Sequence, residues 1–213
     1  MRLYVLCEGS TEERFVKEFL APYLLNDNIY AKEINLDGVS RYAKIRKVLE
    51  TLCKGDTSAY VTTMLDYYKL PKDTPGKYTA TDAFADAKNI DAAVNADLGG
   101  CRNLFINLIV HEFESLLFSD ISAFKGEAKA SEKDLLKLAR IKNDPKFPTP
   151  EHINDSEMTA PSKRILNILP RYVKTLNGLT IAKRITIEKI AEECPHFCAW
   201  IKNIKALAKE GAQ

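Results

Sequence analysis

The chain has 213 residues, of which 46% are hydrophobic and 28% charged, and its formal net charge is +2. This composition excludes disordered and fibrous classes, and the length suffices for one buried core. No apolar run approaches the length of a membrane span, and the N-terminus enters an apolar segment with no signal peptide, so we expect no membrane partner. Five cysteines without a CxxC pair indicate reduced thiols, which predicts a cytoplasmic protein.

The first strand and helix frame a candidate site. Leu3–Cys7 is apolar without polar alternation, which predicts a strand buried on both faces, and it stops at Glu8. The helix that follows has Ser10 and Glu13 at capping-box spacing. A capping role for Glu13 leaves Glu8, at the carboxyl end of the strand, and Glu12, one turn later, available for a ligand.

Strands and helices alternate along the first 120 residues. After a first helix to about Asn26, we predict a strand over Ile29–Leu36 and a helix that is capped by Ser40 and runs to Cys53. A strand over Ala59–Leu65 follows and ends on Asp66, and a loop covers Tyr67–Lys77. The last two elements are a helix from Thr81–Asp82 to Leu98 and a strand over Asn103–Val110. The alternation predicts an α/β fold with a compact, Rossmannoid, mainly parallel sheet flanked by helices.

The second half of the chain is predicted to be mostly helical. Helices are expected over Ser131–Lys142, Pro161–Leu176 and Thr186–Lys209, the last interrupted near Pro195. We therefore predict a single domain over residues 1–213, in which residues 1–120 form the α/β core and residues 121–213 a helical extension packed on it.

Three apolar strands end on acidic residues, namely Glu8, Asp66 and the pair Glu112 and Glu114. Parallel strands place these carboxylates along one edge of the sheet, where they repel unless a cation neutralises them. All-oxygen ligation suits Mg²⁺ or Mn²⁺, although separately solvated loop starts would give the same spacing. If the segment stays extended, Glu112 and Glu114 share a face; if it is helical, Glu114 can still face the site, whereas Glu112 depends on the strand persisting.

Basic residues concentrate between Pro161 and Lys189, in a segment that carries a single acid, Glu188. A polyanionic partner and a solvated helix face both fit this pattern. Tyr67 and Tyr68 could stack on bases or pack beside the strand. The segment Cys194–Cys198 lacks the four ligands of a structural zinc site, so we expect no zinc there.

Several motifs in order resemble one known family. They are Glu8-Gly9-Ser10-Thr11-Glu12, Thr62-Thr63-Met64-Leu65-Asp66-Tyr67-Tyr68, His111-Glu112-Phe113-Glu114 with Leu116-Leu117-Phe118, Pro161-Ser162-Lys163-Arg164-Ile165, Tyr172-Val173-Lys174 and Cys194-Pro195-His196-Phe197. Together they resemble a Toprim-like family of unknown function from bacteria and archaea that is related to OLD-type nucleases. The resemblance covers nearly the whole chain and implies a Toprim α/β sheet with a Mg²⁺-dependent acidic site.

Carried over by position, the resemblance makes Glu8 the motif glutamate, Glu12 the second acid and Asp66 the first acid of an Asp-x-Asp pair. Tyr68 stands where the second Asp is expected, so Glu112 or Glu114 would have to replace that ligand. The chain also begins at the first Toprim strand, so any ATPase is expected to act as a separate subunit.

The resulting hypothesis is Mg²⁺-dependent cleavage of nucleic acid, with DNA as the expected substrate, in a defence or DNA-processing system. Glu8, Glu12, Asp66 and Glu114 would hold one or two Mg²⁺ ions. Glu8, Asp66 and Glu114 would form the catalytic site with Lys174, which would contact the phosphate or assist the leaving oxygen. Basic residues would position the nucleic acid backbone, namely Lys163, Arg164, Arg171 and Lys174. The alternative is a non-catalytic subunit that binds an ATPase partner or nucleic acid, and either function is compatible with a homo-oligomer.

Overall fold

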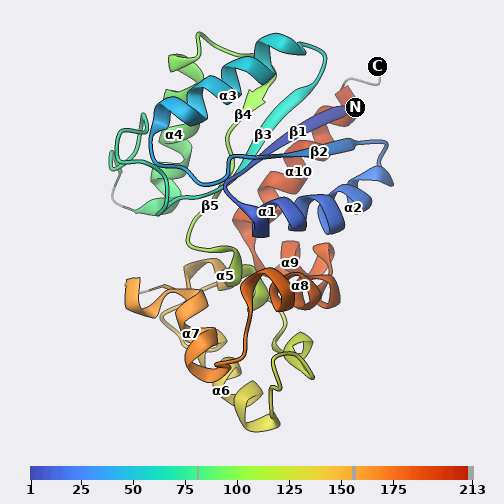
Figure 1. The fold of residues 1–213 in the computed structure, drawn as a ribbon, viewed down its shortest axis with the longest axis vertical. Helices are drawn as coiled ribbons and strands as arrows, with labels where there is room; N and C mark the ends of the chain where they lie inside the picture. Colours follow the sequence, from blue (N-terminus) through green and yellow to red (C-terminus); the bar gives the residue numbers. More distant parts are fainter. Residues whose placement is uncertain (81, 155–156, 211–213) are drawn as a thin grey trace. The chain divides into compact units, whose positions relative to one another are not determined.

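A parallel sheet organises the first half of the chain (Figure 1). In the computed structural model, which describes residues 1–80, 82–154 and 157–210, the sheet contains β1 (Arg2–Cys7), β2 (Tyr30–Asn35), β3 (Tyr60–Asp66), β4 (Leu104–Phe105) and β5 (Leu108–Ile109). The strand order is β2-β1-β3-β4, with β5 also paired to β3, and these pairings are all parallel. The predicted mainly parallel α/β sheet flanked by helices is confirmed.

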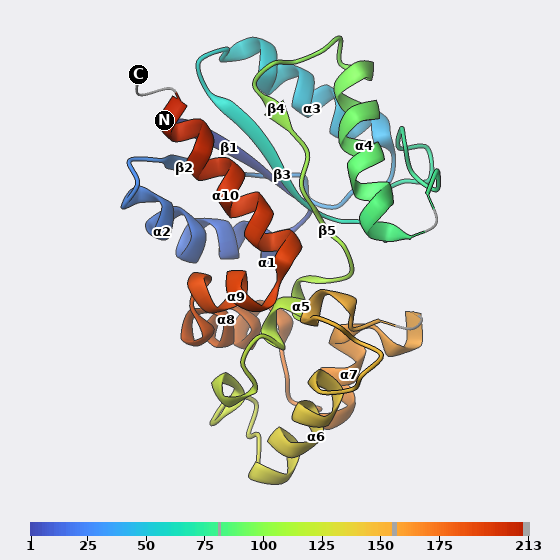
Figure 2. The same ribbon diagram turned by 180° about the vertical axis from the view of Figure 1, so that it is seen from behind.

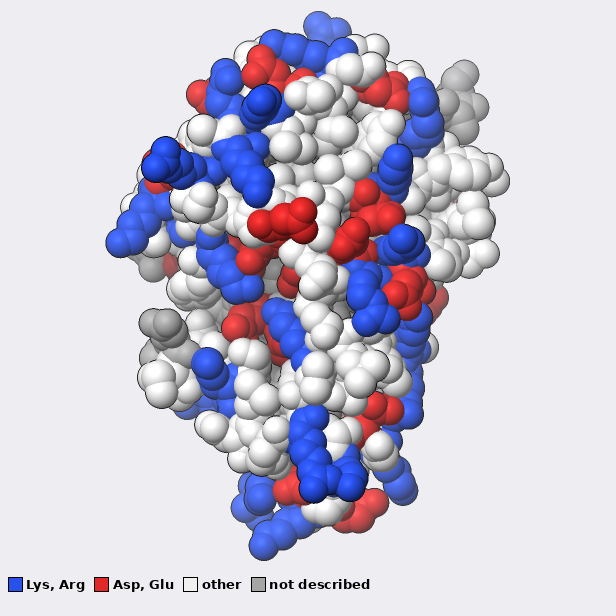
Figure 3. Space-filling model, viewed as in Figure 1, with Lys and Arg blue, Asp and Glu red and all other residues white. Residues whose placement is uncertain are grey.

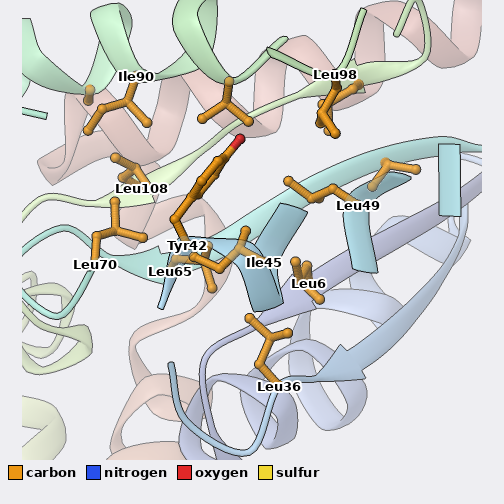
Figure 4. Close-up of a cluster of buried hydrophobic side chains, with 14 of the residues drawn as sticks. Leu6, Leu36, Tyr42, Ile45, Leu49, Leu65, Leu70, Ile90, Leu98 and Leu108 are labelled. Atoms are coloured by element: carbon orange, nitrogen blue, oxygen red, sulfur yellow. The ribbon is translucent and has the colours of Figure 1, made fainter. Parts of the chain in front are cut away.

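Helices cover the two faces of this sheet (Figures 1 and 2). On one face, α1 (Ser10–Phe15), the π-helical η1 (Val16–Leu20) and α2 (Ala21–Leu25) follow each other directly. On the other face, α3 (Tyr42–Gly55) and α4 (Ala83–Asp97) pack through Ile45, Leu49 and Ile90 against Leu6 and Leu65 of the strands, as Figure 4 shows. The apolar run of β1 is therefore buried on both sides, as its lack of alternation predicts.

The strand order reverses direction between β1 and β3. The chain leaves β1 toward β2 on one side, whereas it leaves β3 toward β4 on the other. Such a topological switch point opens a crevice outside the carboxyl ends of the two strands, where α/β sheets bind ligands. In this sheet the switch point is flanked by the residues that follow Cys7 and by those that end β3.

The last predicted strand, Asn103–Val110, is wrong in its continuity, because the structure splits it into β4 and β5. Between the two pieces, side chains take the place of strand partners. The Ile106 N–H donates to Asp91 at 2.6 Å, while the Asn107 N–H donates to Thr63 Oγ1 at 3.0 Å and the Asn107 carbonyl accepts from the same hydroxyl.

The second half of the chain is mostly helical, as predicted. It contains α5 (Phe113–Leu117), η2 (Ile121–Phe124), α6 (Glu132–Lys142), η3 (Pro150–His152), η4 (Glu157–Thr159), α7 (Pro161–Ile168), η5 (Lys174–Gly178), α8 (Leu179–Ile185), α9 (Ile187–Glu193) and α10 (Pro195–Glu210). Two compact units result: Met1–Val110 with the chain from Lys205 onward, and His111–Ile204. That all 213 residues act as one domain stays a prediction. In the described ranges, no helix is both long and apolar enough for a membrane span.

Two predicted helix starts are wrong in their capping. Ser10 is the first residue of α1 rather than its cap, and the Glu13 carboxylate accepts from Asn35 Nδ2 at 2.8 Å instead of closing a capping box. Arg41, not Ser40, precedes α3, and its side chain makes no capping hydrogen bond; the Tyr42 N–H donates to Asp73 Oδ1 at 3.4 Å instead. A capping box does form at α6, between Ser131 and Asp134.

Two other helix predictions have mixed outcomes. Asp82 caps α4 by accepting from the N–H groups of Phe84 and Ala85, while Thr81, its predicted companion, lies outside the described residues. The predicted helix Pro161–Leu176 ends at Ile168, two residues before Pro170, because proline has no N–H to donate and disfavours helix in the residue before it.

Candidate metal centre

Glu8 and Asp66 lie at the switch point of the sheet. Cys7 of β1 is in register with Met64 of β3, so Glu8 follows β1 beside the last residues of β3, which ends on Asp66. The backbone holds Glu8 in place, because its carbonyl accepts from the Gly38 N–H at 2.9 Å. The structure thus brings together the first two acids that the sequence places at strand ends.

A lysine ammonium lies between these carboxylates. Lys69 Nζ is 3.1 Å from Glu8 Oε1 and 3.8 Å from Asp66 Oδ2. The Asp66 side chain is 4% exposed and the Glu8 side chain 13%, whereas the Lys69 side chain is 49% exposed. The other oxygen of Glu8, Oε2, is buried and has no hydrogen-bond partner in the described part of the chain. The cation therefore faces solvent, with two nearly buried carboxylates behind it.

Glu12 lies close to the turn that follows Glu8. Its side chain is buried in the first turn of α1, and a Cβ placed on Gly9 would come within 3.9 Å of Glu12 Oε2. The carboxylate of Glu12 therefore lies over the backbone of Gly9, one residue from Glu8.

The loop after β3 is fixed by Asp86, a residue that the sequence did not single out. The buried Asp86 carboxylate accepts from the Tyr67 hydroxyl at 2.6 Å and from the N–H groups of Tyr78, Thr79 and Ala80 at 2.6–2.9 Å. Burial raises the pKa of Asp86, but these hydrogen bonds outweigh it, so the pKa lies below its ordinary value. Tyr67 therefore packs inside the protein, whereas its neighbour Tyr68 is 56% exposed.

In the second unit, the strand does not persist through His111–Glu114: Glu112 is extended, and α5 begins at Phe113. Glu112 is the N-cap residue of α5, and its carboxylate accepts from the Ser162 N–H at 2.8 Å and from the Ser162 hydroxyl at 3.0 Å. The alternative in which Glu112 and Glu114 share one face of a strand is therefore wrong. Glu112 instead joins the start of α5 to the start of α7.

Glu114 and Lys174 form a buried ion pair. The Glu114 side chain is 0% exposed, its Oε2 lies 3.0 Å from Lys174 Nζ, and its Oε1 accepts from the Tyr172 hydroxyl at 3.4 Å. Burial raises the pKa of Glu114, and the Lys174 ammonium opposes that rise. Burial and the neighbouring Glu114 also raise the pKa of Tyr172. Tyr172 and Lys174, which belong to one sequence motif, thus both contact the Glu114 carboxylate.

The basic residues expected to contact nucleic acid differ in their surroundings. Lys163 and Arg171 are exposed. Arg164, in contrast, donates to the Thr159 carbonyl at 2.6 Å and lies over the Phe147 ring, and Lys174 pairs with Glu114. On the face drawn in Figure 3, basic and acidic side chains are interspersed.

The donor atoms at the sheet edge fit a single Mg²⁺ or Mn²⁺ ion. Mg²⁺ is usually bound through one or two carboxylates and keeps several waters. Glu8 and Asp66 already share the Lys69 ammonium, and Glu8 Oε2 is a buried oxygen that no described residue hydrogen-bonds. Over residues 1–80, 82–154 and 157–210, no group of three or more Asp, Glu, His or Cys side chains is arranged to hold a metal. A two-carboxylate site thus fits better than a larger protein cage.

Comparison with known proteins places the chain in a family. Residues 7–205 match a domain of unknown function, DUF4276, and the chain belongs to this family. No curated protein matches the sequence. Two solved structures of the C-terminal region of the OLD protein from Xanthomonas campestris pv. campestris are similar. The one phased with iodine has 12% identity and a TM-score of 0.44, covering 99% of this chain and 98% of that chain. The one phased with platinum has 14% identity and a TM-score of 0.46, covering 100% and 97%.

Proposed function

We propose that this protein is a Toprim-like nuclease that cleaves phosphodiester bonds of DNA in a Mg²⁺-dependent reaction. The observation that carries the proposal is that Glu8 and Asp66 share a cation at the switch point of a parallel sheet, with Lys69 Nζ at 3.1 and 3.8 Å. This is the place where α/β sheets bind ligands, and the two carboxylates are oxygen donors of the kind that Mg²⁺ prefers.

Glu8 and Asp66 would hold the ion, and Glu12 lies near the turn that follows Glu8. When bound, a Mg²⁺ ion lowers the pKa of a coordinated water and offsets charge on the phosphate. The chain orients Asp66 through the Tyr68 N–H, which donates to its Oδ1 at 2.9 Å. The Tyr68 ring, 56% exposed, offers a face on which a base can stack, and such stacking contributes roughly 1–3 kcal/mol.

The second unit would contribute to nucleic acid binding. Lys174 is 30% exposed and reaches solvent while its ammonium pairs with Glu114, so we assign it a phosphate contact and assign Glu114 the role of holding it. Lys163 and Arg171 are exposed and would contact the nucleic acid backbone without reading bases.

The experiment that tests this proposal is cleavage of plasmid and linear DNA with and without Mg²⁺, by the wild type and by Asp66→Ala. We expect Mg²⁺-dependent cleavage by the wild type and none by Asp66→Ala. Asp73→Ala is the matched control, because Asp73 is an exposed carboxylate on the loop after β3, and it should cleave like the wild type. Equal cleavage by wild type and Asp66→Ala would rule out the proposed chemistry.

One observation favours a second function, a non-catalytic subunit that binds an ATPase partner or nucleic acid. Tyr68 occupies the position of the second Asp in the resembling family, so one expected metal ligand is missing. Calorimetric titration with Mg²⁺ separates the two functions. Binding that is lost in Glu8→Ala supports the nuclease, whereas DNA binding without any Mg²⁺ binding supports the subunit.

A further inference from the structure

Lys69 lies in the turn directly after β3, with its ammonium beside the carboxylates of Glu8 and Asp66. It stands three residues after Asp66, in a turn whose Lys69 and Leu70 N–H groups both donate to the Asp66 carbonyl, at 3.2 and 3.1 Å. Leu70 is buried, so the backbone of this turn is anchored directly beside the site. From this turn, the Lys69 side chain extends toward the site and places its ammonium beside the carboxylates of Glu8 and Asp66.

The exposure of the three side chains gives Lys69 the outer position. The carboxylates of Glu8 and Asp66 are 13% and 4% exposed, while Lys69 is 49% exposed. A lysine carries its ammonium on a flexible four-carbon stem, so the head can leave while the turn stays in place. An ion pair with such an exposed partner is weak, which makes it exchangeable for a stronger cation.

We propose that Lys69 is a tethered counter-ion of the site, which holds Glu8 and Asp66 close together until a divalent cation displaces it. Lys69 is thereby a positioning residue that sets the affinity of the site for the ion. After displacement, the Lys69 side chain keeps its ammonium near the site, where it can form a charge-assisted hydrogen bond with an anionic phosphate. This inference rests on the proposed function, because it takes the same carboxylates as ligands.

The test is titration of the full chain with Mn²⁺ by calorimetry, in the wild type, Lys69→Met and Lys72→Met. Lys72 is an exposed lysine three residues further along the loop, so Lys72→Met removes the same charge without touching the site. We expect Lys69→Met to bind Mn²⁺ about fivefold more tightly than the wild type, because a weak ion pair no longer competes. Lys72→Met should stay within about twofold of the wild type, since its charge acts only at longer range.

A second measurement follows the ammonium itself. The lysines are reductively methylated with a ¹³C label, and each methyl signal is assigned by the substitution that removes it. Addition of Mg²⁺ should shift the Lys69 signal and leave the Lys72 signal unchanged. Failure of Lys69→Met to tighten Mn²⁺ binding beyond Lys72→Met overturns the inference, as does an unmoved Lys69 signal in a protein that binds Mg²⁺.

The outcomes separate this inference from the proposed function. If Lys69→Met tightens Mn²⁺ binding but the wild type cleaves no DNA, Lys69 has the inferred role and the nuclease proposal fails. If cleavage depends on Mg²⁺ and Asp66 while Lys69→Met binds Mn²⁺ like the control, only the inference fails. If no variant binds Mn²⁺, both fail.

Discussion

The two units each hold a carboxylate against a lysine, and the two pairs differ in exposure. Glu114 is 0% exposed and Lys174 is 30% exposed, with 3.0 Å between their charged atoms. Glu8 is 13% exposed and Lys69 is 49% exposed, at nearly the same distance of 3.1 Å. The two ion pairs thus have nearly the same distance between their charged atoms, but one is buried and the other is open to water.

The difference in exposure predicts different roles. A buried charge that loses its partner is strongly destabilising, because the remaining charge has no water to solvate it. A partly exposed pair contributes about 0–1 kcal/mol, because water can replace either partner. The Glu114–Lys174 pair is therefore expected to maintain the structure of its unit, whereas the Glu8–Lys69 pair can exchange its cation.

The largest expected effect is that of Lys174→Met. It leaves the Glu114 carboxylate buried without a counter-ion, so we expect a loss of about 4 kcal/mol in the free energy of unfolding at neutral pH. Urea unfolding followed by circular dichroism measures this loss. The control is the double variant Glu114→Gln with Lys174→Met, which removes both charges and should recover most of the stability. A single variant as stable as the wild type would contradict a buried, charged pair.

The acids at the sheet edge show what the sequence could predict. The run Leu3–Cys7 has no polar alternation, which predicts a buried strand, and the β-branched and aromatic run Ala59–Leu65 predicts a second strand, so the sequence places an acid at the carboxyl end of each. Parallel pairing alone then brings Glu8 and Asp66 to one edge. Local pattern sufficed here because the relevant contacts follow from strand direction.

Contacts between distant residues could not be predicted in the same way. Asp86 holds the backbone of Tyr78–Ala80 and the Tyr67 hydroxyl, yet in the sequence it is one acid on an alanine-rich helix. Glu13 accepts a hydrogen bond from Asn35 because the pairing of β2 with β1 brings Asn35 near it. The capping box therefore does not form, although Ser10 and Glu13 have the right spacing for one. The break before Pro170, in contrast, had a local signal in the proline itself.

The second largest effect is expected for Asp86→Ala, which tests whether the loop carrying Lys69 is fixed. The substitution leaves the Tyr67 hydroxyl and three backbone N–H groups without their acceptor, so we expect a loss of about 3 kcal/mol in unfolding free energy. Urea unfolding measures it. Asp82→Ala, which removes only a helix cap, should lose about 1 kcal/mol. Equal losses in the two variants would mean that Asp86 acts as no more than a cap-like contact.

A smaller effect is expected from pH, through His111 in the second unit. Burial, followed by the charge of His152, lowers the pKa of His111 to about 4. The unfolded chain therefore binds a proton that the folded chain does not, so the contribution of His111 to stability is present at neutral pH and is lost as pH falls toward 4. From pH 7 to pH 5 this loss is about 2 kcal/mol.

Urea unfolding at pH 7 and pH 5, compared between the wild type and His111→Gln, isolates this contribution. The variant should lose about 2 kcal/mol less than the wild type over that range, since glutamine does not titrate. The same pH dependence in both proteins would show that His111 is protonated in the folded protein or that other groups govern the change.

The smallest effect on stability is expected for Glu8→Gln, although it lies at the proposed metal site. The substitution removes an ion pair whose lysine is 49% exposed, so the free energy of unfolding should change by less than about 1 kcal/mol. Urea unfolding measures this change, and calorimetric titration of the same sample should show that Mn²⁺ binding is lost. A loss of stability as large as that of Lys174→Met would place the Glu8–Lys69 pair among structural ion pairs. Unchanged stability with lost Mn²⁺ binding would instead mean that the charge of Glu8 serves ligand binding, since the fold is equally stable without it.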